Sequence, residues 1–368
     1  MKKKFKKVII INPFGIGDVL FSTPVIENVK ISYPDSFIGY VCNARTAPIF
    51  YSNPKVDKVF IYEKDDWRSL WHKSKFRCVI AFIKFLWQIK KCNFDLAIDL
   101  SLGRHYSFFL WLLGVKKRYG FNYKKRGFFL TDKIGMEGYQ KKHVIEYYLD
   151  LLRFMNLEPV ETKPKVYINR QDRLWAEEFL KKRGVSKNCL IGIVPGGGVS
   201  WGKAVDIRRW SKDKFSQLAD AIIDKFPADV IIFGGASEVN LCKEVAAMMK
   251  HQPIQIAGET TLMQFAALLS MCDVVVANDG GPLHLSVAAG VKTVSLFGPV
   301  DERVYGQYPN DPNVHKIIMK NLSCRPCYNK FRMPPCRNAK ECLSGIAVDE
   351  VLCAVKDLLK LSLPQHAV

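Results

Sequence analysis

The sequence predicts an α/β fold made of two halves, each with its own parallel sheet. Short apolar runs typical of strands alternate with segments whose apolar spacing is that of a helix, and this alternation implies parallel strands joined by helices. The pattern starts twice, near residue 7 and near residue 189, with the helical stretch "RQDRLWAEEFLKKRG" between the two series. A chain of 368 residues, 48% of them hydrophobic, can bury two cores of this kind.

The elements can be assigned in order along the chain. In the first half the predicted strands are "KVIII", "FIGYV", "KVFIY" and "FDLAIDL", and residues 19–32 fit a helix. In the second half the predicted strands are "CLIGIVP", "DVIIFGG", "PIQIAG", "DVVVAND" and "KTVSLFGP". The helix-length segments between them are 211–226, 237–250, 261–271 and 282–290. Open parallel sheets bind ligands beyond the carboxyl ends of their strands, so residues that follow these strands are the candidates for a site.

The positive charge of the chain is concentrated in its first half. The formal net charge is +20, and residues 1–150 contain 27 Lys and Arg against 13 Asp and Glu, which gives +14 there and +6 for the remainder. A basic domain predicts a polyanionic partner, and nucleic acid and an anionic membrane surface are the two usual candidates. Charge alone leaves both open.

Residues 67–92 combine tryptophans, basic residues and an apolar run that Lys84 interrupts. A membrane-spanning helix needs about 20 predominantly apolar residues, so this shorter, charged run does not predict one. Cations interleaved with aromatic residues suit a segment that lies in a lipid interface, and residues 108–121 have the same character. The alternative is a core helix with a basic edge, which gives a similar pattern.

The chain contains eleven cysteines and no recognisable signal peptide, which predicts reduced thiols in a cytoplasmic protein. Four of the cysteines lie close together late in the sequence: Cys324, Cys327, Cys336 and Cys342. They begin with a CxxC pair, and four thiolates can hold a structural zinc ion. The second pair is spaced unlike a compact zinc knuckle, so reduced or packed thiols are the favoured interpretation, and we expect no catalytic metal.

The stretch "INPFGIGDVL" places Gly15, Gly17 and Asp18 where the first strand ends and the first helix begins. Glycines at such a turn let the backbone approach a ligand, and a helix N-terminus favours negative charge. Asp18 is therefore either a helix cap or a reactive carboxylate aimed into a binding site.

Two glycine-rich segments follow strands in the second half, "VPGGGVSWGK" and "NDGGPLH". Their backbone amides could face a phosphate, and the guanidinium groups of Arg208 and Arg209 suit phosphate oxygens. The glycines concerned are Gly196, Gly197, Gly280 and Gly281. Together these residues predict a diphosphate site. A nicotinamide dinucleotide is disfavoured because "GIGDVL" lacks the third glycine of that fingerprint, and the sequence has no GxxxxGK[ST] phosphate loop.

Several motifs together resemble one known family. "GIGDVLFSTPVIENVK", "PGGG" followed by "RRWSKDKFSQLADAI", "FGGASE", "ANDGGPLHLSVAAGVKTVSLFGP" and the late "CRPC" are similar to the bacterial ADP-heptose:lipopolysaccharide heptosyltransferases, glycosyltransferase family 9. The resemblance runs from about residue 7 to about residue 360. It implies a GT-B architecture, two Rossmann-like domains facing one another across a cleft. The expected parts are an acceptor domain at 1–168, a sugar-nucleotide domain at 169–346, and a closing helix and tail at 347–368 that pack back on the first domain.

The resemblance also assigns roles to residues. Asp18 matches the proposed general base, which takes a proton from the acceptor hydroxyl as that oxygen attacks the anomeric carbon with inversion. The donor-binding positions include the four glycines and two arginines named above, together with Glu238, Thr260, Thr261, Asp279 and His284. The glycines of the first turn, Gly15 and Gly17, would contact acceptor or phosphate. The family often has lysine at the position of Arg208 and "NDTGPMH" where this chain has "NDGGPLH", which makes the donor less certain than the fold.

The function implied is transfer of a heptose from ADP-heptose to the inner core of lipopolysaccharide by an inverting, metal-independent enzyme without a cofactor. An anionic acceptor at the inner face of the cytoplasmic membrane would account for the basic first domain, and no nucleic-acid partner is then expected. Two alternatives remain at this stage. One is a related transferase that uses another nucleotide sugar, such as a UDP-sugar, for a surface polysaccharide. The other is a non-catalytic membrane- or nucleic-acid-binding protein on the same fold, although no RNA-binding motif is present.

Overall fold

The computed structural model describes residues 5–185, 189–198 and 206–360. The chain divides into two compact units, Met1–Pro164 and Lys165–Val368, each described by itself below. The division lies a few residues before the expected boundary at 168, in an extended segment between two helices.

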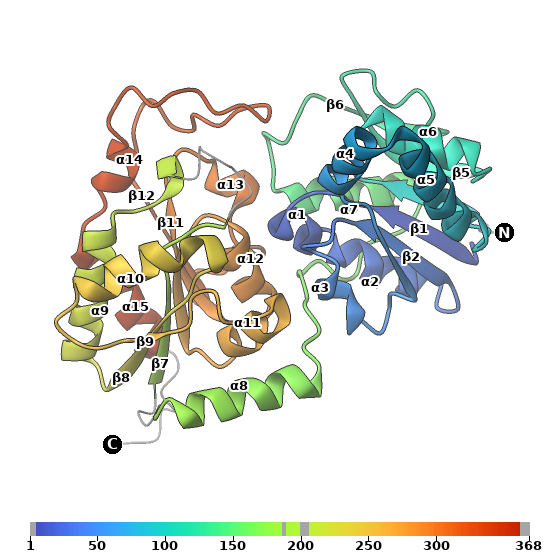
Figure 1. Ribbon diagram of the computed structural model, residues 1–368. Coiled ribbons are helices and arrows are strands. Elements are labelled where there is room, and N and C mark those ends of the chain that lie inside the picture. The colour runs from blue at the N-terminus through green and yellow to red at the C-terminus, as the bar shows by residue number, and fades with distance from the viewer. Residues whose placement is uncertain (1–4, 186–188, 199–205, 361–368) are drawn as a thin grey trace. The chain divides into compact units, whose positions relative to one another are not determined.

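Unit 1 contains six parallel strands in the order β3-β2-β1-β4-β5-β6 (Figure 1). The strands are β1 (Lys7–Ile11), β2 (Phe37–Cys42), β3 (Lys58–Ile61), β4 (Leu96–Asp99), β5 (Lys117–Tyr123) and β6 (Asp132–Met136). Central strands such as β1 are continuous apolar runs because helices cover both faces of the sheet. The four predicted strands are confirmed. The other two were missed because β5 and β6 mix lysine, glycine and polar residues, and part of β5 had been assigned to an interfacial segment.

The helices of unit 1 lie on both faces of its sheet. They are α1 (Ile16–Phe21), α2 (Thr23–Ser32), α3 (Pro48–Tyr51), α4 (Lys64–Lys73), α5 (Lys75–Lys90), α6 (Arg104–Leu112) and α7 (Val144–Phe154). Helices α5 and α6 share one core cluster with β1, while α1 and α2 contact α7. The single helix expected at 19–32 is two helices that meet at Ser22. Pro24 causes this break, since proline has no amide hydrogen and is tolerated only in the first turn of a helix.

Unit 2 repeats the same topology. Its strands are β7 (Cys189–Val194), β8 (Ala228–Ile232), β9 (Ile254–Gln255), β10 (Val274–Asn278), β11 (Lys292–Phe297) and β12 (His315–Met319). The strands are parallel and ordered β12-β11-β10-β7-β8-β9, which read from β9 is the order found in unit 1 and in doubly wound nucleotide-binding folds. Five of these strands were predicted, whereas β12 was not.

Helices also cover both faces of the second sheet (Figure 1). They are α8 (Arg170–Lys182), α9 (Lys212–Lys225), α10 (Val239–Ala247), α11 (Leu262–Leu269), α12 (Gly281–Ala288), α13 (Glu302–Tyr305), α14 (Glu341–Ser344) and α15 (Val348–Lys360), with a 3₁₀ turn η2 (Ala236–Glu238) before α10. Helices α9, α10 and α15 share one core cluster with the sheet, and α11 packs on α8.

The closing helix α15 packs within unit 2. Its apolar stripe, which includes Val351, Val355 and Leu358, is buried in the core of unit 2 against α9 and strands β10 to β12. The apolar face of this helix is therefore used within unit 2, and its packing on the first domain stays a prediction. The predicted tail at 361–368 lies outside the described residues.

Among the helices described, not one combines the length and the apolar character that crossing a bilayer requires.

Candidate functional site

Each sheet has one point where the strand order reverses, and ligands of such folds bind there, beyond the carboxyl ends of the strands. In unit 1 this point lies between β1 and β4, and in unit 2 between β7 and β10. The turn that carries Asp18 follows β1, and the two predicted glycine-rich segments follow β7 and β10. The topology therefore brings the turn of Asp18 to the switch point of unit 1 and the two glycine-rich segments to that of unit 2.

In unit 2, the buried carboxylate of Glu238 holds the loop that follows β7. Its Oε1 atom accepts hydrogen bonds from the amides of Gly197 and Gly198, each at 3.0 Å, and from Nη2 of Arg209 at 3.2 Å. Its Oε2 atom accepts from the amide of Gly235 at 2.9 Å. Four donors to one carboxylate fix the shape of the loop before any ligand binds.

The same packing explains two of the predicted glycines. A Cβ atom on Gly196 would lie 2.0 Å from Oε1 of Glu238, and a Cβ atom on Gly280 would lie 2.3 Å from the carbonyl oxygen of Gly197. Gly196 leaves room for the Glu238 carboxylate, which comes from η2 after β8, and Gly280 is required because the loops after β7 and β10 approach one another closely. Gly281, the remaining predicted glycine, is the first residue of α12.

Asn278, which we had not singled out, ties the two strand ends together. Its Nδ2 atom donates to the carbonyl oxygens of Pro195, at 2.9 Å, and Gly196, at 2.8 Å. Its Oδ1 atom accepts from the amide of Trp210 at 2.9 Å. The sequence held a hint of this role, since Asn278 is the last residue of a buried apolar strand, where an amide side chain requires partners.

Arg208, Asp279 and His284 form a buried group at the start of α12. Nη2 of Arg208 is ion-paired with Oδ2 of Asp279, and Nε2 of His284 lies 4.0 Å from Oδ1 of Asp279. Burial raises the pKa of Asp279, and the charge of Arg208 opposes that shift. Burial, followed by the charge of Arg208, lowers the pKa of His284 to about 3, so this imidazole is neutral at physiological pH. The group therefore provides a fixed guanidinium charge beside the N-terminus of α12, which favours anions.

The two predicted threonines lie at a different place in unit 2. Thr261 is the N-cap of α11, where its Oγ1 atom accepts from the amide of Gln264 at 3.2 Å. Thr260 precedes it and is partly buried. The amide of Gly258 donates to the carbonyl of Gly234 at 2.9 Å, so this segment runs beside the loop that follows β8 rather than beside β10.

In unit 1, Asp18 is the third residue of α1 and acts as a cap. Its Oδ2 atom accepts from the amide of Gly15, the N-cap residue, at 3.2 Å, and Gly17 lies in the same first turn. Asn12 supports the turn by donating to the carbonyl of Asp18 at 2.9 Å. The capping interpretation of Asp18 is therefore correct, and it leaves the reactive role open because one carboxylate can serve both.

Buried tyrosines surround this turn. The pKa values of Tyr40, Tyr139 and Tyr148 are raised, chiefly by burial, and the negative charge of Asp18 adds to the shift in each case. The charge of Asp18 is thus felt by three phenols that stay protonated at neutral pH.

Asp99 is a second carboxylate at the switch point of unit 1 that we had not singled out. It ends β4 and is in register with Ile11 at the end of β1. Burial raises its pKa to about 6, although it accepts hydrogen bonds from the amide of Ser101 at 2.9 Å and from the hydroxyl of Ser101 at 2.5 Å. The sequence signal was a charged residue at the end of the apolar run "LAID".

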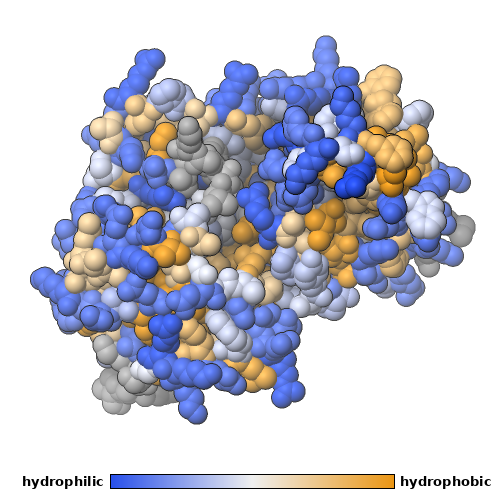
Figure 2. Space-filling model, viewed as in Figure 1, coloured by the Kyte–Doolittle hydropathy of each residue, from blue (hydrophilic) through white to orange (hydrophobic). Residues whose placement is uncertain are grey.

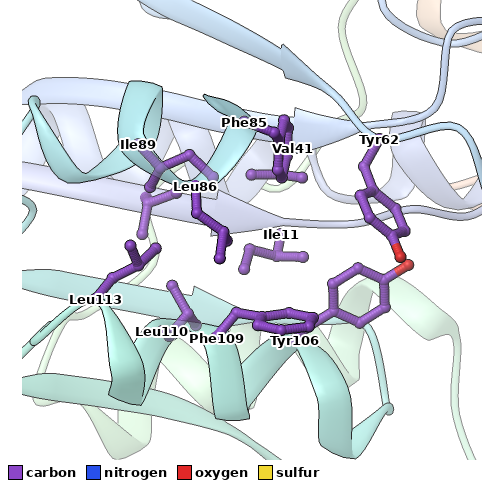
Figure 3. A pocket seen from close by; sticks show the side chains of 11 residues that line it. Ile11, Val41, Tyr62, Phe85, Leu86, Ile89, Tyr106, Phe109, Leu110 and Leu113 are labelled. Carbon is purple, nitrogen blue, oxygen red and sulfur yellow. The ribbon is translucent and has the colours of Figure 1, made fainter. Parts of the chain in front are cut away.

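Unit 1 also contains an apolar pocket beneath α5 and α6 (Figure 3). Leu86 and Ile89 of α5, Leu110 of α6, and Ile11 of β1 are among its lining side chains. The rings of Tyr62 and Tyr106, 5.6 Å apart between centroids, close one end (Figure 3). The pocket offers no charged group to a diphosphate.

The late cysteines differ in their surroundings. Cys342 is buried in the core of unit 2, Cys327 is partly exposed, and Cys324 and Cys336 are exposed. In the part of the chain that the structure describes, no group of three or more His, Cys, Asp or Glu side chains is arranged to hold a metal ion. The zinc alternative gains no support from these positions.

Comparisons with known proteins agree with this architecture. The family model for glycosyltransferase family 9 (heptosyltransferase) matches residues 82–336. Lipooligosaccharide heptosyltransferase 2 of Campylobacter jejuni is 26% identical over 366 residues, which cover 97% of this chain and 99% of that protein.

Two solved structures share the fold. A glycosyl transferase family 9 protein of Veillonella parvula matches with a TM-score of 0.80 and 21% identity, over 98% of this chain and 99% of that one. The ADP-heptose lipopolysaccharide heptosyltransferase II of E. coli matches with a TM-score of 0.75 and 20% identity, over 97% and 100%. The predicted GT-B class, with two Rossmann-like domains in one chain, is confirmed.

Proposed function

The chain belongs to glycosyltransferase family 9, the heptosyltransferases, and from this premise we propose that it transfers a heptose from ADP-heptose to the inner core of lipopolysaccharide, with inversion at the anomeric carbon. The observation that carries the proposal is the prebuilt anion site of unit 2. There, buried Arg208 is paired with Asp279 at the start of α12, and Glu238 and Asn278 fix the glycine loops beside it.

This site suits the diphosphate of a nucleotide sugar. As the bond between the anomeric carbon and the diphosphate oxygen breaks, negative charge grows on the leaving ADP. Fixed backbone amides and a guanidinium group stabilise such charge at no cost of reorganisation. We propose that Arg208 and the first turn of α12 supply this stabilisation, without a divalent metal or a further cofactor.

Asp18 is the proposed general base. It follows β1 at the switch point of unit 1, where acceptors of such folds bind, and it is partly exposed. Its carboxylate would take the proton of the acceptor hydroxyl while that oxygen forms its bond to the anomeric carbon. General-base assistance of this kind is typically worth about 10² to 10⁴ in rate.

We propose that the enzyme works in the cytoplasm, peripherally on the inner face of the inner membrane. The +14 charge of residues 1–150 supports this, because the proposed acceptor is an anionic glycolipid.

The test is ADP release from ADP-heptose, with and without a heptose-free lipopolysaccharide acceptor. We expect acceptor-dependent release that falls about 10²- to 10⁴-fold in kcat for Asp18→Asn. Asp213→Asn is the matched control, because Asp213 also lies in the first turn of its helix and is exposed. Full activity of the Asp18 variant would remove Asp18 as the base. Nucleotide release only from a UDP-sugar would show that the donor is a UDP-sugar and not ADP-heptose. No release from any donor, together with salt-dependent RNA binding, would contradict an enzymatic role.

A further inference from the structure

We infer that unit 1 docks on an anionic lipid surface through one side of α5. We call this side the α5 face and define it by Phe76, Val79, Ile80, Ile83 and Trp87. The inference deepens the proposed function, and it rests on that function in one respect, that the proposed acceptor is a lipid. Binding of unit 1 to lipid can be tested without any sugar transfer.

Helix α5 is apolar on two opposite sides. Its inner side chains, among them Leu86 and Ile89, line the pocket against β1 and α6 (Figure 3). Its outer positions 76, 80, 83 and 87 recur at intervals of four, three and four residues, so they form one stripe along the helix. Phe76 is 75% exposed, Ile83 59% and Trp87 57%. A contiguous exposed apolar stripe of this kind marks an interaction surface, so an apolar layer should cover it.

The length of α5 excludes crossing and favours lying flat. Sixteen residues of helix extend about 24 Å, less than the roughly 30 Å of a bilayer's hydrocarbon core. An interfacial helix buries its apolar side at the level of the headgroups and acyl-chain ends, which this length permits.

Basic side chains flank the stripe. Arg77, Lys84 and Lys91 lie on one side of it and Lys75 and Lys90 on the other, while α5 contains no acidic residue. The Nζ atom of Lys91 is 3.4 Å from the centroid of the Trp87 ring, so the cation sits over the apolar stripe itself. The covering layer must therefore be both apolar and anionic, which describes a lipid interface with anionic headgroups.

The segments around α5 are also rich in basic and exposed apolar residues. Residues 64–126 contain 15 Lys and Arg against four Asp and Glu. Trp111 and Leu112 of α6 are 51% and 56% exposed, and Phe128 is 74% exposed. Figure 2 shows hydrophobic and hydrophilic side chains side by side at the upper right of the view.

Ring contacts join these outlying residues to α5. Phe128 contacts Phe129, which contacts Phe108, with centroids 5.1 Å apart in both pairs. Phe109, next to Phe108, reaches Phe82 of α5 at 4.8 Å. These ring contacts link α5, α6 and Phe128 in one aromatic cluster, and the exposed apolar side chains on its elements are more than a protein surface exposed to water alone normally gathers.

Charge argues against a second copy of the chain as the occupant. Two α5 faces in a symmetric dimer would bring their basic flanks together, and like charges across an interface are unfavourable. Anionic lipid meets both requirements of the surface.

The first test is binding to vesicles. We expect the full-length protein to sediment with vesicles of phosphatidylcholine and phosphatidylglycerol but not with phosphatidylcholine alone, and less strongly as salt is raised. The double variant Phe76→Ser/Ile83→Ser should lower the partition coefficient about tenfold or more, because two exposed apolar side chains no longer enter the interface. The matched control is Leu174→Ser/Met248→Ser, which replaces two apolar residues of unit 2 with 46% and 48% exposure. It should bind as the unchanged protein does.

Vesicles of brominated lipids test whether tryptophan side chains enter the bilayer interface. Tryptophan fluorescence should be quenched on binding to brominated vesicles, and Trp87→Phe should remove part of that quenching. Equal binding of the Phe76/Ile83 variant and the unchanged protein would overturn the inference in favour of attraction by charge alone. Absence of binding to anionic vesicles, or a dimer that the double substitution dissociates, would also overturn it.

A transfer assay separates this inference from the proposed function. With a deacylated, water-soluble acceptor, the Phe76/Ile83 variant should release ADP as fast as the unchanged protein. With the acceptor embedded in vesicles, its rate should fall along with its partition coefficient. Vesicle binding without any transfer would leave the docking surface standing and contradict the enzyme, whereas equal transfer rates on embedded acceptor would contradict the docking surface.

Discussion

Asp99 and Asp279 lie at corresponding edges of the two sheets, yet their surroundings differ. Asp99 ends β4, beside β1, and Asp279 follows β10, beside β7, in sheets with the same strand order. Burial raises the pKa of both carboxyls. Asp279 is paired with Arg208, whereas Asp99 accepts hydrogen bonds from Ser101 and has no cationic partner among the described residues.

The difference teaches what topology does and does not fix. The strand order brings a carboxylate to the switch point in each unit, and in the described part of the chain a buried guanidinium group joins it only in unit 2. The carboxylate of unit 2 is thereby held by a fixed cation, while those of unit 1, Asp18 and Asp99, are held by hydrogen bonds from neighbouring residues.

The largest expected effect comes from breaking the buried ion pair. Arg208→Met leaves Asp279 as an uncompensated buried charge, so we expect the free energy of unfolding of unit 2 to fall by about 3 to 5 kcal/mol. Denaturant unfolding followed by tryptophan fluorescence measures this. Arg303→Met is the control, because its pair with Asp301 lies where Arg303 is 75% exposed, and it should cost at most about 1 kcal/mol. Similar losses in both variants would contradict the contrast between buried and exposed pairs.

Asp99 should make the stability of unit 1 depend on pH. Its folded-state pKa of about 6 lies above the usual 3.8, so the folded state binds more protons between these values. The stability of unit 1 should therefore decrease as pH rises from about 4 to about 6, by at most about 3 kcal/mol, and Asp99→Asn should remove that slope. Denaturant titrations at several pH values test this, and an unchanged slope in the variant would assign it to other groups.

Two buried histidines make unit 2 respond in the other direction. The pKa values of His284 and His315 are lowered, chiefly by burial, to about 3 and about 4. Their contribution to stability is present above the unfolded-state pKa of about 6.5 and is lost as pH falls below it. The same titrations should thus show unit 2 losing stability as the pH falls from about 6.5 to about 4. Protonation of Asp99 should stabilise unit 1 as the pH falls from about 6 to about 4.

A smaller effect is expected from the glycine loops. In Gly280→Ala the new Cβ atom would lie 2.3 Å from the carbonyl oxygen of Gly197, which is backbone and cannot rotate away. Forcing the loops apart should cost about 1 to 3 kcal/mol and weaken ADP binding measured by calorimetry. Gly135→Ala in β6 is the control, since its Cβ atom would meet nothing within 4 Å. Unaltered ADP affinity in the Gly280 variant would show that the loop contact does not shape the site.

The smallest effect is expected at Asp18. Its cap bond to the amide of Gly15 is 3.2 Å long, and an asparagine oxygen can accept the same bond, so Asp18→Asn should change stability by less than about 1 kcal/mol. Thermal unfolding checks this. A loss above about 2 kcal/mol would mean that any fall in activity reflects structure, and the case for Asp18 as a base would then fail.

The sequence by itself determined the fold class, the division into two α/β halves and the strand ends that carry the candidate residues. Buried parallel strands are continuous apolar runs, visible over five or six residues, and the motifs that follow them must lie at their carboxyl ends. Gly196 and Gly280 were accordingly predicted to follow strands of the second half, and they follow β7 and β10.

Only the tertiary structure decided how those residues are used. Glu238 binds the amide of Gly197 41 positions away, Asn278 binds the amide of Trp210 68 positions away, and Arg208 pairs with Asp279 71 positions away. The burial of α15 in unit 2 likewise depends on which apolar surface remained uncovered. Local patterns report the preferences of neighbouring residues, whereas these contacts arise from packing between distant segments, which sets burial, charge pairing and therefore pKa.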